Sequence, residues 1–327
     1  MRYIVGVDLG GTNLRVGTVS DDGGSLHGHL IEKTPVWAGP DGAVDQVVCM
    51  IRKSLAAAQD ELSSSEIEVI GVGIGCPGPL DTKSGTVIMT PNLGWTNVPL
   101  RNRVSEGVVL PATLDNDANC AVLGEWWRGA AQGGRVVVGL TIGTGVGGGI
   151  VIDGEVFHGV SDAAGEIGHA SIDPTGRRCK CGNYGCLEAY AAGPAIARRA
   201  VEGIERGTQS KLPDYVAGDL TAVTAETVSQ AANDGDAFCL EVIHETAHFL
   251  GGAVAGLVNI FNPDVVVICG GVTLAGDHLF QPLWDQVRRR AFRPAVEACR
   301  IVPGSLPGTA GVYGAVASFL AQTRGTR

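Results

Sequence analysis

The sequence predicts an α/β protein that folds into two lobes. Strand-like and helix-like segments alternate along most of its 327 residues, which favours a mostly parallel sheet in each lobe. One hydrophobic core seldom serves more than roughly 250 to 300 residues, so a chain of this length is expected to divide. Hydrophobic residues make up 45% of the chain and charged residues 18%, a composition typical of globular proteins.

The first part of the chain predicts a hairpin, then a helix and a strand. Residues 3–9 and 13–19 are β-rich and are separated by glycines, which indicates two paired strands. Apolar residues at helical spacing predict a helix over 41–62, followed by a buried strand over 69–75. A short strand is expected over 112–115.

A second hairpin follows a predicted helix over 117–132. Its strands are expected over 135–142 and 146–152, again with a glycine-rich turn between them. Two similar hairpins suggest two related lobes that face one another across a phosphate. The remaining main elements are a helix over 238–261, a strand over 264–269 and a closing helix over 310–322.

The expected domain boundary lies near Pro111. We expect residues 1–111 and 305–327 to form a smaller α/β domain. Residues 112–304 are expected to form a larger α/β domain that carries a zinc-binding loop.

The charge of the chain disfavours a nucleic-acid partner. The net charge is −10, and the basic residues are mostly scattered. No apolar run approaches the length of a membrane span, and the first strand begins almost at Met1. We therefore expect a cytoplasmic protein with neither a signal segment nor a membrane partner.

Two glycine-rich turns are candidate phosphate sites. Backbone N–H groups of such turns can bind an anion without a lysine, and no GxxxxGK[ST] motif is present. No helix opens directly after the second turn, which disfavours a dinucleotide-binding fingerprint. The alternative is that the glycines only serve hairpin turns. The first turn offers Asp8, near a metal, with Gly10, Gly11, Thr12 and Asn13; the second offers Gly143, Thr144, Gly145, Gly147 and Gly148.

Asp117 is the candidate catalytic base. It lies in the sequence NDAN at the expected start of a helix. Asp and Asn also favour the N-cap position, so a purely capping role is the alternative. Phosphoryl transfer to a hydroxyl needs a group that accepts the proton, and we favour Asp117 in this role.

A zinc site is predicted from three cysteines and a histidine. The spacing C-x-C-x₄-C, with a histidine ten residues upstream, suits a closed tetrahedral zinc with a structural role. The second ring nitrogen of the histidine could then meet a sugar hydroxyl. Two nearby glutamates could accept further hydroxyl hydrogen bonds, or simply face solvent. The ligands are His169, Cys179, Cys181 and Cys186, and the glutamates are Glu166 and Glu188.

These motifs occur in one order along the chain: DLGGTN, NDAN, GTGVGGG, GEIGH and CKCGNYGCLE. Together they resemble the ROK family of repressors, open reading frames and sugar kinases. The resemblance implies the two-lobed actin-like ATPase fold of sugar kinases and Hsp70-type proteins, with the active site in the interdomain cleft. The Cys-rich motif is its most specific part. Within the family the sequence is most similar to the bacterial glucokinases, partly through the NLGW stretch at 92–95.

The resemblance also implies roles for single residues. Asp117 would be the catalytic base, and His169 with the three cysteines would hold zinc. The implied sugar contacts are Asn92, Asn116, Asp117, Glu166, His169 and Glu188, and the adenosine pocket would be lined by Gly270, Gly271, Ala310 and Gly311.

The resemblance implies phosphorylation of glucose at its 6-hydroxyl, with ATP and Mg²⁺. Alternatives are a kinase for N-acylhexosamines, such as N-acetylmannosamine or N-acetylglucosamine, or for fructose. A non-catalytic sugar sensor is disfavoured by the intact Asp117 and both turns, and a repressor by the start of the first strand at residue 2. Polyphosphate remains open as a second donor. A homodimer or a dimer of dimers is expected.

Overall fold

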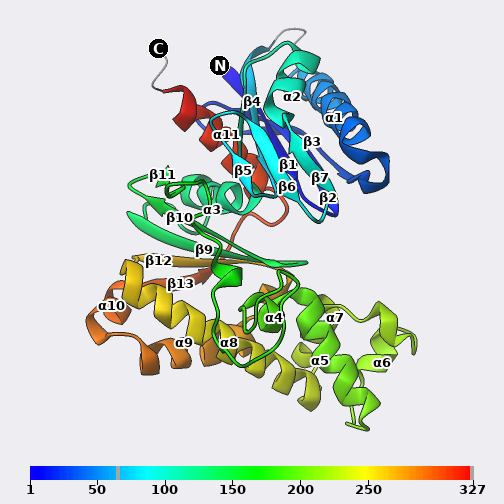
Figure 1. Ribbon diagram of the computed structural model, residues 1–327, viewed down its shortest axis with the longest axis vertical. Helices are drawn as coiled ribbons and strands as arrows, with labels where there is room; N and C mark the ends of the chain where they lie inside the picture. Colours follow the sequence, from blue (N-terminus) through cyan, green and yellow to red (C-terminus); the bar gives the residue numbers. More distant parts are fainter. Residues whose placement is uncertain (64–66, 325–327) are drawn as a thin grey trace. The chain divides into compact units, whose positions relative to one another are not determined.

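The computed structural model describes residues 1–63 and 67–324, which form two compact units (Figure 1). Unit 1 comprises Met1–Arg135, Gly149–Gly165 and Ser305–Arg327, and unit 2 comprises Val136–Gly148 and Glu166–Gly304. Both units combine helices with strands, so the α/β prediction is confirmed. The last three residues of the predicted smaller domain, 325–327, lie outside the described residues.

The main sheet of unit 1 has the strand order β3-β2-β1-β4-β8. Strands β1 and β2 form the predicted antiparallel hairpin, and β2 pairs antiparallel with β3. Strands β1, β4 and β8 run parallel, so their carboxyl ends lie at one edge. The bounds are β1 Arg2–Leu9, β2 Asn13–Ser20, β3 Leu26–Lys33, β4 Glu68–Cys76 and β8 Ala112–Asn116.

Helices α1 (Gly39–Glu61) and α11 (Ala310–Thr323) cover opposite faces of this sheet (Figure 1). Side chains alternate along a strand, so neighbouring residues of β1 belong to different cores. Val5 and Val7 are buried with residues of α1, whereas Ile4 is buried with residues of α11.

A pair of glycines lets α11 approach this sheet closely. Gly6 and Gly73 are in register on β1 and β4. A Cβ at Gly6 would lie 2.3 Å from the carbonyl oxygen of Val312, and one at Gly73 would lie 1.9 Å from that of Ala315. Side chains at either position would therefore push α11 away from the strands.

Unit 1 also contains a small antiparallel sheet and shorter helices. The small sheet has the order β5-β6-β7. Helix α3 packs extensively against α11. The bounds are β5 Leu80–Asp81, β6 Thr86–Thr90, β7 Trp95–Val98, β11 Glu155–Val156, η1 Val36–Ala38, α2 Leu100–Val108 and α3 Asp117–Arg128.

The unit boundary differs from the one expected near Pro111. Strand β8 pairs in parallel with β4, and α3 packs on α11, so both elements belong to unit 1, which continues to Arg135. Residues 149–165 also belong to unit 1. The boundary therefore follows the pairing of β8 with β4, two strands that are distant in sequence.

The second large sheet has the order β11-β10-β9-β12-β13. Strand β12 runs parallel to both β9 and β13. The chain passes from unit 2 to unit 1 within β10, after Gly148. The bounds are β9 Val136–Ile142, β10 Val146–Ile152, β12 Val265–Gly270 and β13 Arg300–Pro303.

The helices of unit 2 lie mainly in its long segment between β10 and β13. The longest, α8, confirms the predicted helix over 238–261. The bounds are η2 Ile167–His169, α4 Glu188–Ala191, α5 Gly193–Glu205, α6 Leu212–Tyr215, η3 Leu220–Ala222, α7 Ala225–Asn233, α8 Ala237–Phe261, η4 Gly271–Ala275, α9 Asp277–Arg290 and α10 Arg293–Ala298.

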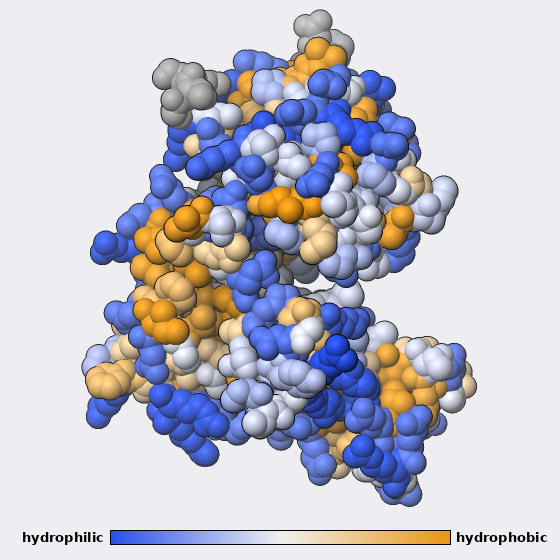
Figure 2. Space-filling view, viewed as in Figure 1, coloured by the Kyte–Doolittle hydropathy of each residue, from blue (hydrophilic) through white to orange (hydrophobic). Residues whose placement is uncertain are grey.

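Hydrophilic side chains predominate on the face shown in Figure 2, and hydrophobic groups are interspersed among them. Such a mixed surface is normal for a folded chain in water. Among the described helices, none has both the length and the apolar character that crossing a membrane would require.

Candidate active site and metal centre

Asp8 lies near the carboxyl end of β1, which places its side chain among the parallel strand ends of unit 1. Arg15 on the neighbouring strand contacts it, with 3.4 Å between Nη1 and Oδ2. Burial raises the pKa of the Asp8 carboxyl, and Arg15 partly opposes this rise. Gly311 also lies beside it, because a Cβ there would be 2.5 Å from the Asp8 Cγ.

The first glycine turn, residues 10–13, joins β1 to β2. The Gly10 N–H donates to the Asn13 carbonyl at 3.0 Å, and Thr34 Oγ1 donates to the Gly10 carbonyl at 2.7 Å. Asn92 adjoins this turn, since a Cβ at Gly11 would lie 3.3 Å from the Asn92 Cβ. A predicted sugar contact and a predicted phosphate turn are therefore neighbours in unit 1.

Asn116, rather than Asp117, is the N-cap of α3. Its Oδ1 accepts hydrogen bonds from the N–H groups of Ala118 at 2.9 Å and Asn119 at 3.2 Å. Asp117 is the first residue of the helix, and its Oδ1 accepts from the Ala118 N–H at 2.9 Å. The interpretation of Asp117 as the N-cap is therefore wrong.

Asp8 and Asp117 lie near the same part of the sheet. Gly75 pairs with Asp8 in register, and a Cβ at Gly75 would lie 3.5 Å from the Asp117 Cα. Burial raises the pKa of the Cys76 and Cys120 thiols well above the usual value, and both aspartates add to the rise. Unit 1 thus gathers carboxylates at the edge where ligands bind in parallel sheets.

The second glycine turn, residues 143–148, lies in unit 2 between β9 and β10. Gly143 donates its N–H to the Gly145 carbonyl at 2.9 Å, and the Gly193 N–H donates to the Gly143 carbonyl at 2.9 Å. Glu188 Oε2 accepts a hydrogen bond from the Val146 N–H at 3.0 Å. Glu188, which is partly exposed, therefore fixes the turn through this hydrogen bond.

The GEIGH motif packs against the start of β10. A Cβ at Gly168 would lie 1.9 Å from the Val146 carbonyl oxygen. The His169 N–H donates to the Glu166 carbonyl at 3.0 Å, which closes the short helix η2. The motif and the second glycine turn are thus neighbours within unit 2.

Gly270 and Gly271 follow the buried part of β12. Gly270 has a φ of 111° and lies in register with Ile142. A Cβ at Gly270 would lie 1.9 Å from the Ile142 carbonyl oxygen. This pair of glycines therefore adjoins the end of β9, where the second glycine turn begins.

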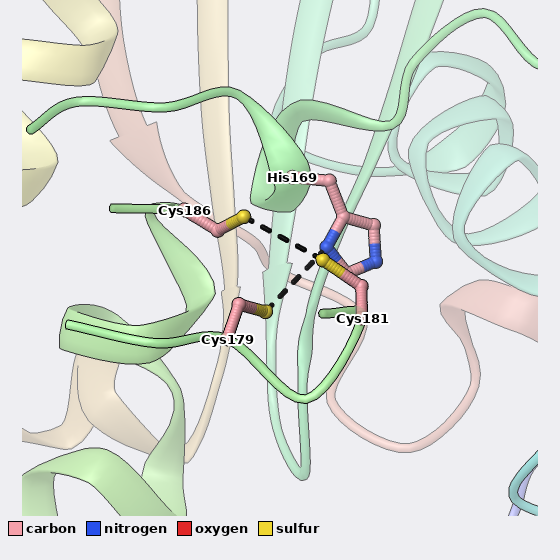
Figure 3. A group of neighbouring side chains, drawn as sticks. All are labelled: His169, Cys179, Cys181 and Cys186. Atoms are coloured by element: carbon pink, nitrogen blue, oxygen red, sulfur yellow. Dashed lines mark hydrogen bonds between the residues drawn. The ribbon is translucent and has the colours of Figure 1, made fainter. Parts of the chain in front are cut away.

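Four side chains form a compact candidate metal centre in unit 2 (Figure 3). One ligand atom from each of His169, Cys179, Cys181 and Cys186 lies within 4.8 Å of every other. The Sγ atoms of Cys181 and Cys186 are 3.7 Å apart, and Cys179 Sγ lies 3.9 Å from His169 Nδ1. Ligands about 2.3 Å from a tetrahedral zinc would be roughly 3.8 Å apart, so the residues fit this metal.

The metal centre adjoins the second glycine turn through one carboxylate. Glu188 Oε1 lies 3.8 Å from Cys179 Sγ, while its other oxygen accepts from Val146. The second ring nitrogen of His169, Nε2, is left on the side away from Cys179 (Figure 3).

The predicted site residues fall into two sets, one on each unit. Unit 1 carries Asp8, Gly10, Gly11, Thr12, Asn13, Asn92, Asn116, Asp117, Ala310 and Gly311. Unit 2 carries Gly143, Thr144, Gly145, Gly147, Gly148, Glu166, His169, Cys179, Cys181, Cys186, Glu188, Gly270 and Gly271. The location of the active site in an interdomain cleft stays a prediction.

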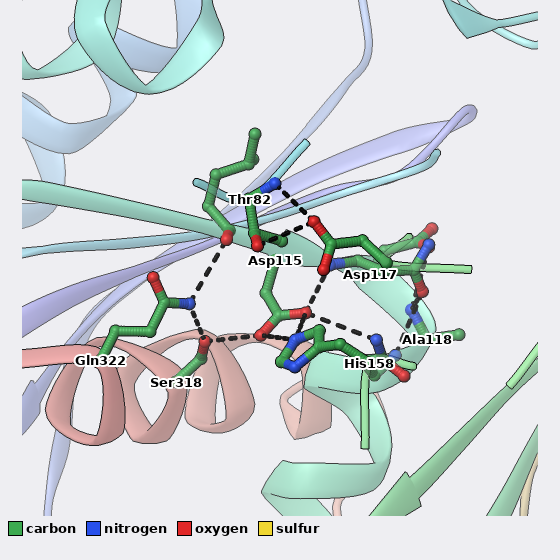
Figure 4. A network of polar contacts seen from close by, with 11 residues as sticks. Thr82, Asp115, Asp117, Ala118, His158, Ser318 and Gln322 are labelled. Carbon is green, nitrogen blue, oxygen red and sulfur yellow. Dashed lines mark hydrogen bonds and ion pairs between the residues drawn. The ribbon is translucent and has the colours of Figure 1, made fainter. Parts of the chain in front are cut away.

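A buried polar network lies beside Asp117, and no sequence motif predicted it (Figure 4). Asp115 is only 1% exposed, and His158 Nε2 lies 3.0 and 3.1 Å from its two oxygens. Ser318 Oγ donates to Asp115 at 2.8 Å. The partners are 43 and 203 residues apart, so motif spacing could not reveal them.

The two units and their glycine turns define a protein with the two-lobed actin-like ATPase fold. The sequence model of the ROK family matches residues 4–323. The chain belongs to the ROK family.

Its relatives include enzymes named glucokinase. The one from Halalkalibacterium halodurans is 38% identical over 96% of this chain and 93% of its own length. The one from Thermotoga maritima is 38% identical over 95% of each chain. A ROK family glucokinase from Streptomyces griseus, solved with glucose and AMPPNP, has a TM-score of 0.82 at 32% identity, covering 98% of this chain and 99% of the other.

Proposed function

We propose that this protein is an ATP-dependent glucokinase, which transfers the γ-phosphoryl group of ATP to the 6-hydroxyl of glucose. The position of Asp117 carries the proposal. It begins α3 directly after the parallel strand β8, near Asp8 and the first glycine turn, while Asn116 supplies the helix cap. The likeness to glucokinases over nearly the whole chain supports the same reaction.

In this mechanism Asp117 accepts the proton of the 6-hydroxyl as that oxygen attacks the γ-phosphorus of ATP. A carboxylate suits this role because the proton leaves as the new P–O bond forms. The backbone N–H groups of the two glycine turns bind the phosphates, and Asp8 faces the Mg²⁺ of MgATP. Gly270, Gly271, Ala310 and Gly311 line the adenosine site.

Each unit carries side chains that are proposed sugar contacts. Asn92 and Asn116 contribute amide groups, and Asn116 Oδ1 is already engaged by the helix cap, so its Nδ2 is the group available to a hydroxyl. Glu166, Glu188 and His169 Nε2 are the proposed partners from unit 2. These groups orient the sugar, and orientation accounts for a large part of the acceleration of phosphoryl transfer.

His169, Cys179, Cys181 and Cys186 would hold a structural zinc. Burial and the neighbouring thiols raise the pKa of Cys186 to about 12, so this thiol would stay protonated without a cation beside it. A closed set of four protein ligands gives zinc an ordering role. The residues from 170 to 187 contain no described helix or named strand, and the metal would stabilise their conformation.

The compartment and the assembly are part of the proposal. Three thiols in one small cluster fit a reducing compartment, which supports the cytoplasm. The homodimer or dimer of dimers stays a prediction, which light scattering on the purified protein would test.

The function is tested by ATP-dependent ADP release on a panel of sugars with Mg²⁺ present. We expect a clear preference for glucose over fructose, mannose, N-acetylglucosamine and N-acetylmannosamine. Preference for an N-acetyl sugar or for fructose would keep the mechanism and replace the substrate. Sugar binding without ADP release would contradict catalysis and identify a sensor.

Replacing the proposed base tests the mechanism. Asp117→Asn keeps the size of the side chain but removes its ability to take a proton, so kcat should fall by about a hundred- to ten-thousand-fold. Glucose binding, measured by calorimetry, should persist. The exposed Asp285→Asn on α9 is the matched control and should leave kcat unchanged. A variant at position 117 with near-normal kcat would show that another group is the base.

A further inference from the structure

The network beside Asp117 connects three separate segments of unit 1. Asp115 ends β8 with Asn116, His158 belongs to the segment that follows β11, and Ser318 lies on α11 (Figure 4). His158 Nε2 is 3.0 Å from one Asp115 oxygen and 3.1 Å from the other. Ser318 Oγ donates to Oδ2 at 2.8 Å, and Gln322 Nε2 donates to Ser318 Oγ at 2.9 Å.

Asp115 is also bonded to the first turn of α3, which carries Asp117. Its Oδ1 accepts from the Asn116 N–H at 2.8 Å and from Asn119 Nδ2 at 3.4 Å. A movement of the Asp115 carboxylate would therefore shift the start of the helix. The ring of His158 faces this buried carboxylate and becomes its cationic partner when it is protonated.

The segment carrying His158 is fixed at a second point. Asp162 Oδ2 accepts from both the N–H and the Oγ1 of Thr82, each at 2.9 Å. Asp162 has a φ of 56°, an uncommon conformation for a residue with a side chain. Residues 157–165 are thus held to β8 and to the β5 region, and the next residue along the chain is Glu166.

The surroundings of His158 favour its protonated form. A hydrogen bond to Asp115 is the main cause that raises the His158 pKa, burial opposes it, and the charge of Asp162 and the Val156 backbone also raise it. The charged groups that act on the ring are therefore Asp115 on β8 and Asp162 in its own segment. Asp117, at the start of α3, is drawn in the same view (Figure 4).

We propose that His158 is a positioning residue for phosphoryl transfer. Its protonated ring neutralises Asp115. This contact fixes the start of α3, which carries Asp117, and the segment that leads to Glu166. This inference rests on the proposed function. Loss of the proton would leave Asp115 buried without its cationic partner, which is a costly arrangement. The base would then be misplaced while the nucleotide-binding turns remain intact.

The sign of the pH effect follows from the raised pKa. A group whose folded pKa is raised contributes its stabilisation at low pH and loses it as pH rises through that pKa. We therefore expect kcat of the wild type to decline on the alkaline side, with the midpoint above the ordinary histidine value of 6.5.

The kinetic test uses His158→Gln, which keeps a polar side chain but cannot become a cation. Its kcat at neutral pH should fall by about ten- to a hundred-fold, as for a small displacement of reacting groups, and the alkaline decline should disappear. The KM for ATP should change little. His244→Gln, an exposed histidine on α8, is the matched control and should retain the wild-type profile. An H158Q enzyme with wild-type kcat and the wild-type alkaline decline would overturn the proposal.

The second measurement does not depend on enzymatic activity. NMR titration of the His158 imidazole in the full-length wild type should give a pKa above 6.5, and Asp115→Asn should lower it. A His158 pKa at or below the ordinary value in the wild type would overturn the proposal even if H158Q failed to fold. A wild type that phosphorylates no sugar would instead refute the proposed function, and the NMR titration would then still decide whether His158 is the cationic partner of Asp115.

Discussion

Gly311 shows how a missing side chain allows a helix to lie against the Asp8 carboxylate. A Cβ at this position would lie 2.5 Å from the Asp8 Cγ and 2.7 Å from its Oδ2. Because α11 is packed on both the sheet and α3, the helix cannot easily move away. Gly311→Ala should therefore displace Asp8, lower kcat/KM for ATP, and reduce the stability by about 1–3 kcal/mol, as for overpacked cores.

Steady-state kinetics and urea denaturation would measure both effects. The matched control is Gly256→Ala, in the exposed part of α8, where a Cβ would meet nothing within 4 Å. Alanine favours a helix over glycine, so the control should be neutral or slightly stabilising. Equal behaviour of the two variants would mean that the contact with Asp8 does not matter.

Single residues could be proposed for the site where they belong to a contiguous motif. Asp8 and Asp117 each lie within a short run that begins or ends an element, so the sequence alone marked them. His158 and Asp115 are 43 residues apart and meet only through the sheet and the segment after β11. Neither the spacing of residues nor the composition predicts a contact between segments so far apart. Their ion pair was therefore found only in the structure.

At the scale of elements, the loop from 170 to 187 is the segment whose conformation depends most on one group of side chains, the candidate metal ligands. Apart from two isolated bridges, Ser171 with Cys186 and Arg178 with Tyr184, the loop from 170 to 187 lacks named strands. Removal of one proposed zinc ligand should therefore loosen it. Cys181→Ser should reduce bound zinc from about one per chain to a small fraction, lower the melting temperature and lower kcat.

Elemental analysis, thermal unfolding and the sugar assay would be read together for this variant. Cys49→Ser changes another exposed thiol, on α1, and should leave all three readings unchanged. A strong chelator should reproduce the effect of Cys181→Ser on the wild type, and added zinc should reverse it. A zinc-free wild type with full activity would contradict the zinc proposal.

The elements with a strong local periodicity were predictable, whereas shorter ones such as β3, β5–β7 and α5 were not predicted. Both hairpins, the long helix α8 and the closing helix α11 lie within a few residues of their predicted bounds. The start of α3 shows the limit: Asn116 and Asp117 are both good capping residues, and only the hydrogen bonds of Asn116 Oδ1 decide between them.

At the scale of the whole molecule, the division into units could not be read from the chain. Sequence order suggested a boundary near Pro111, yet β8 pairs with β4 and residues 149–165 also belong to unit 1. The chain therefore passes between the units after Arg135, Gly148, Gly165 and Gly304. Each of these positions depends on contacts between elements that are distant in sequence. A short motif does not predict such contacts.

The last of these crossings is secured by one buried carboxylate, Glu125 on α3, which is 1% exposed. It accepts hydrogen bonds from the N–H groups of Ser305 at 3.0 Å, Leu306 at 2.9 Å and Ala130 at 2.8 Å. These contacts hold the chain where it re-enters unit 1, some 180 residues after Glu125. The carboxylate therefore positions the residues that lead into α11, which begins at Ala310.

Glu125→Gln would replace one accepting oxygen by an amide that donates, so it would lose acceptors for buried N–H groups and place donors against donors. Hydrogen bonds to a charged group contribute about 1.5–3 kcal/mol, and we expect a loss of this size in urea denaturation of the whole chain. Glu241→Gln, on the exposed side of α8, should change the stability by less than about 0.5 kcal/mol. If both variants unfold at the same urea concentration, the hydrogen bonds of Glu125 do not stabilise the segment at Ser305. The packing of α11 alone would then hold this segment in unit 1.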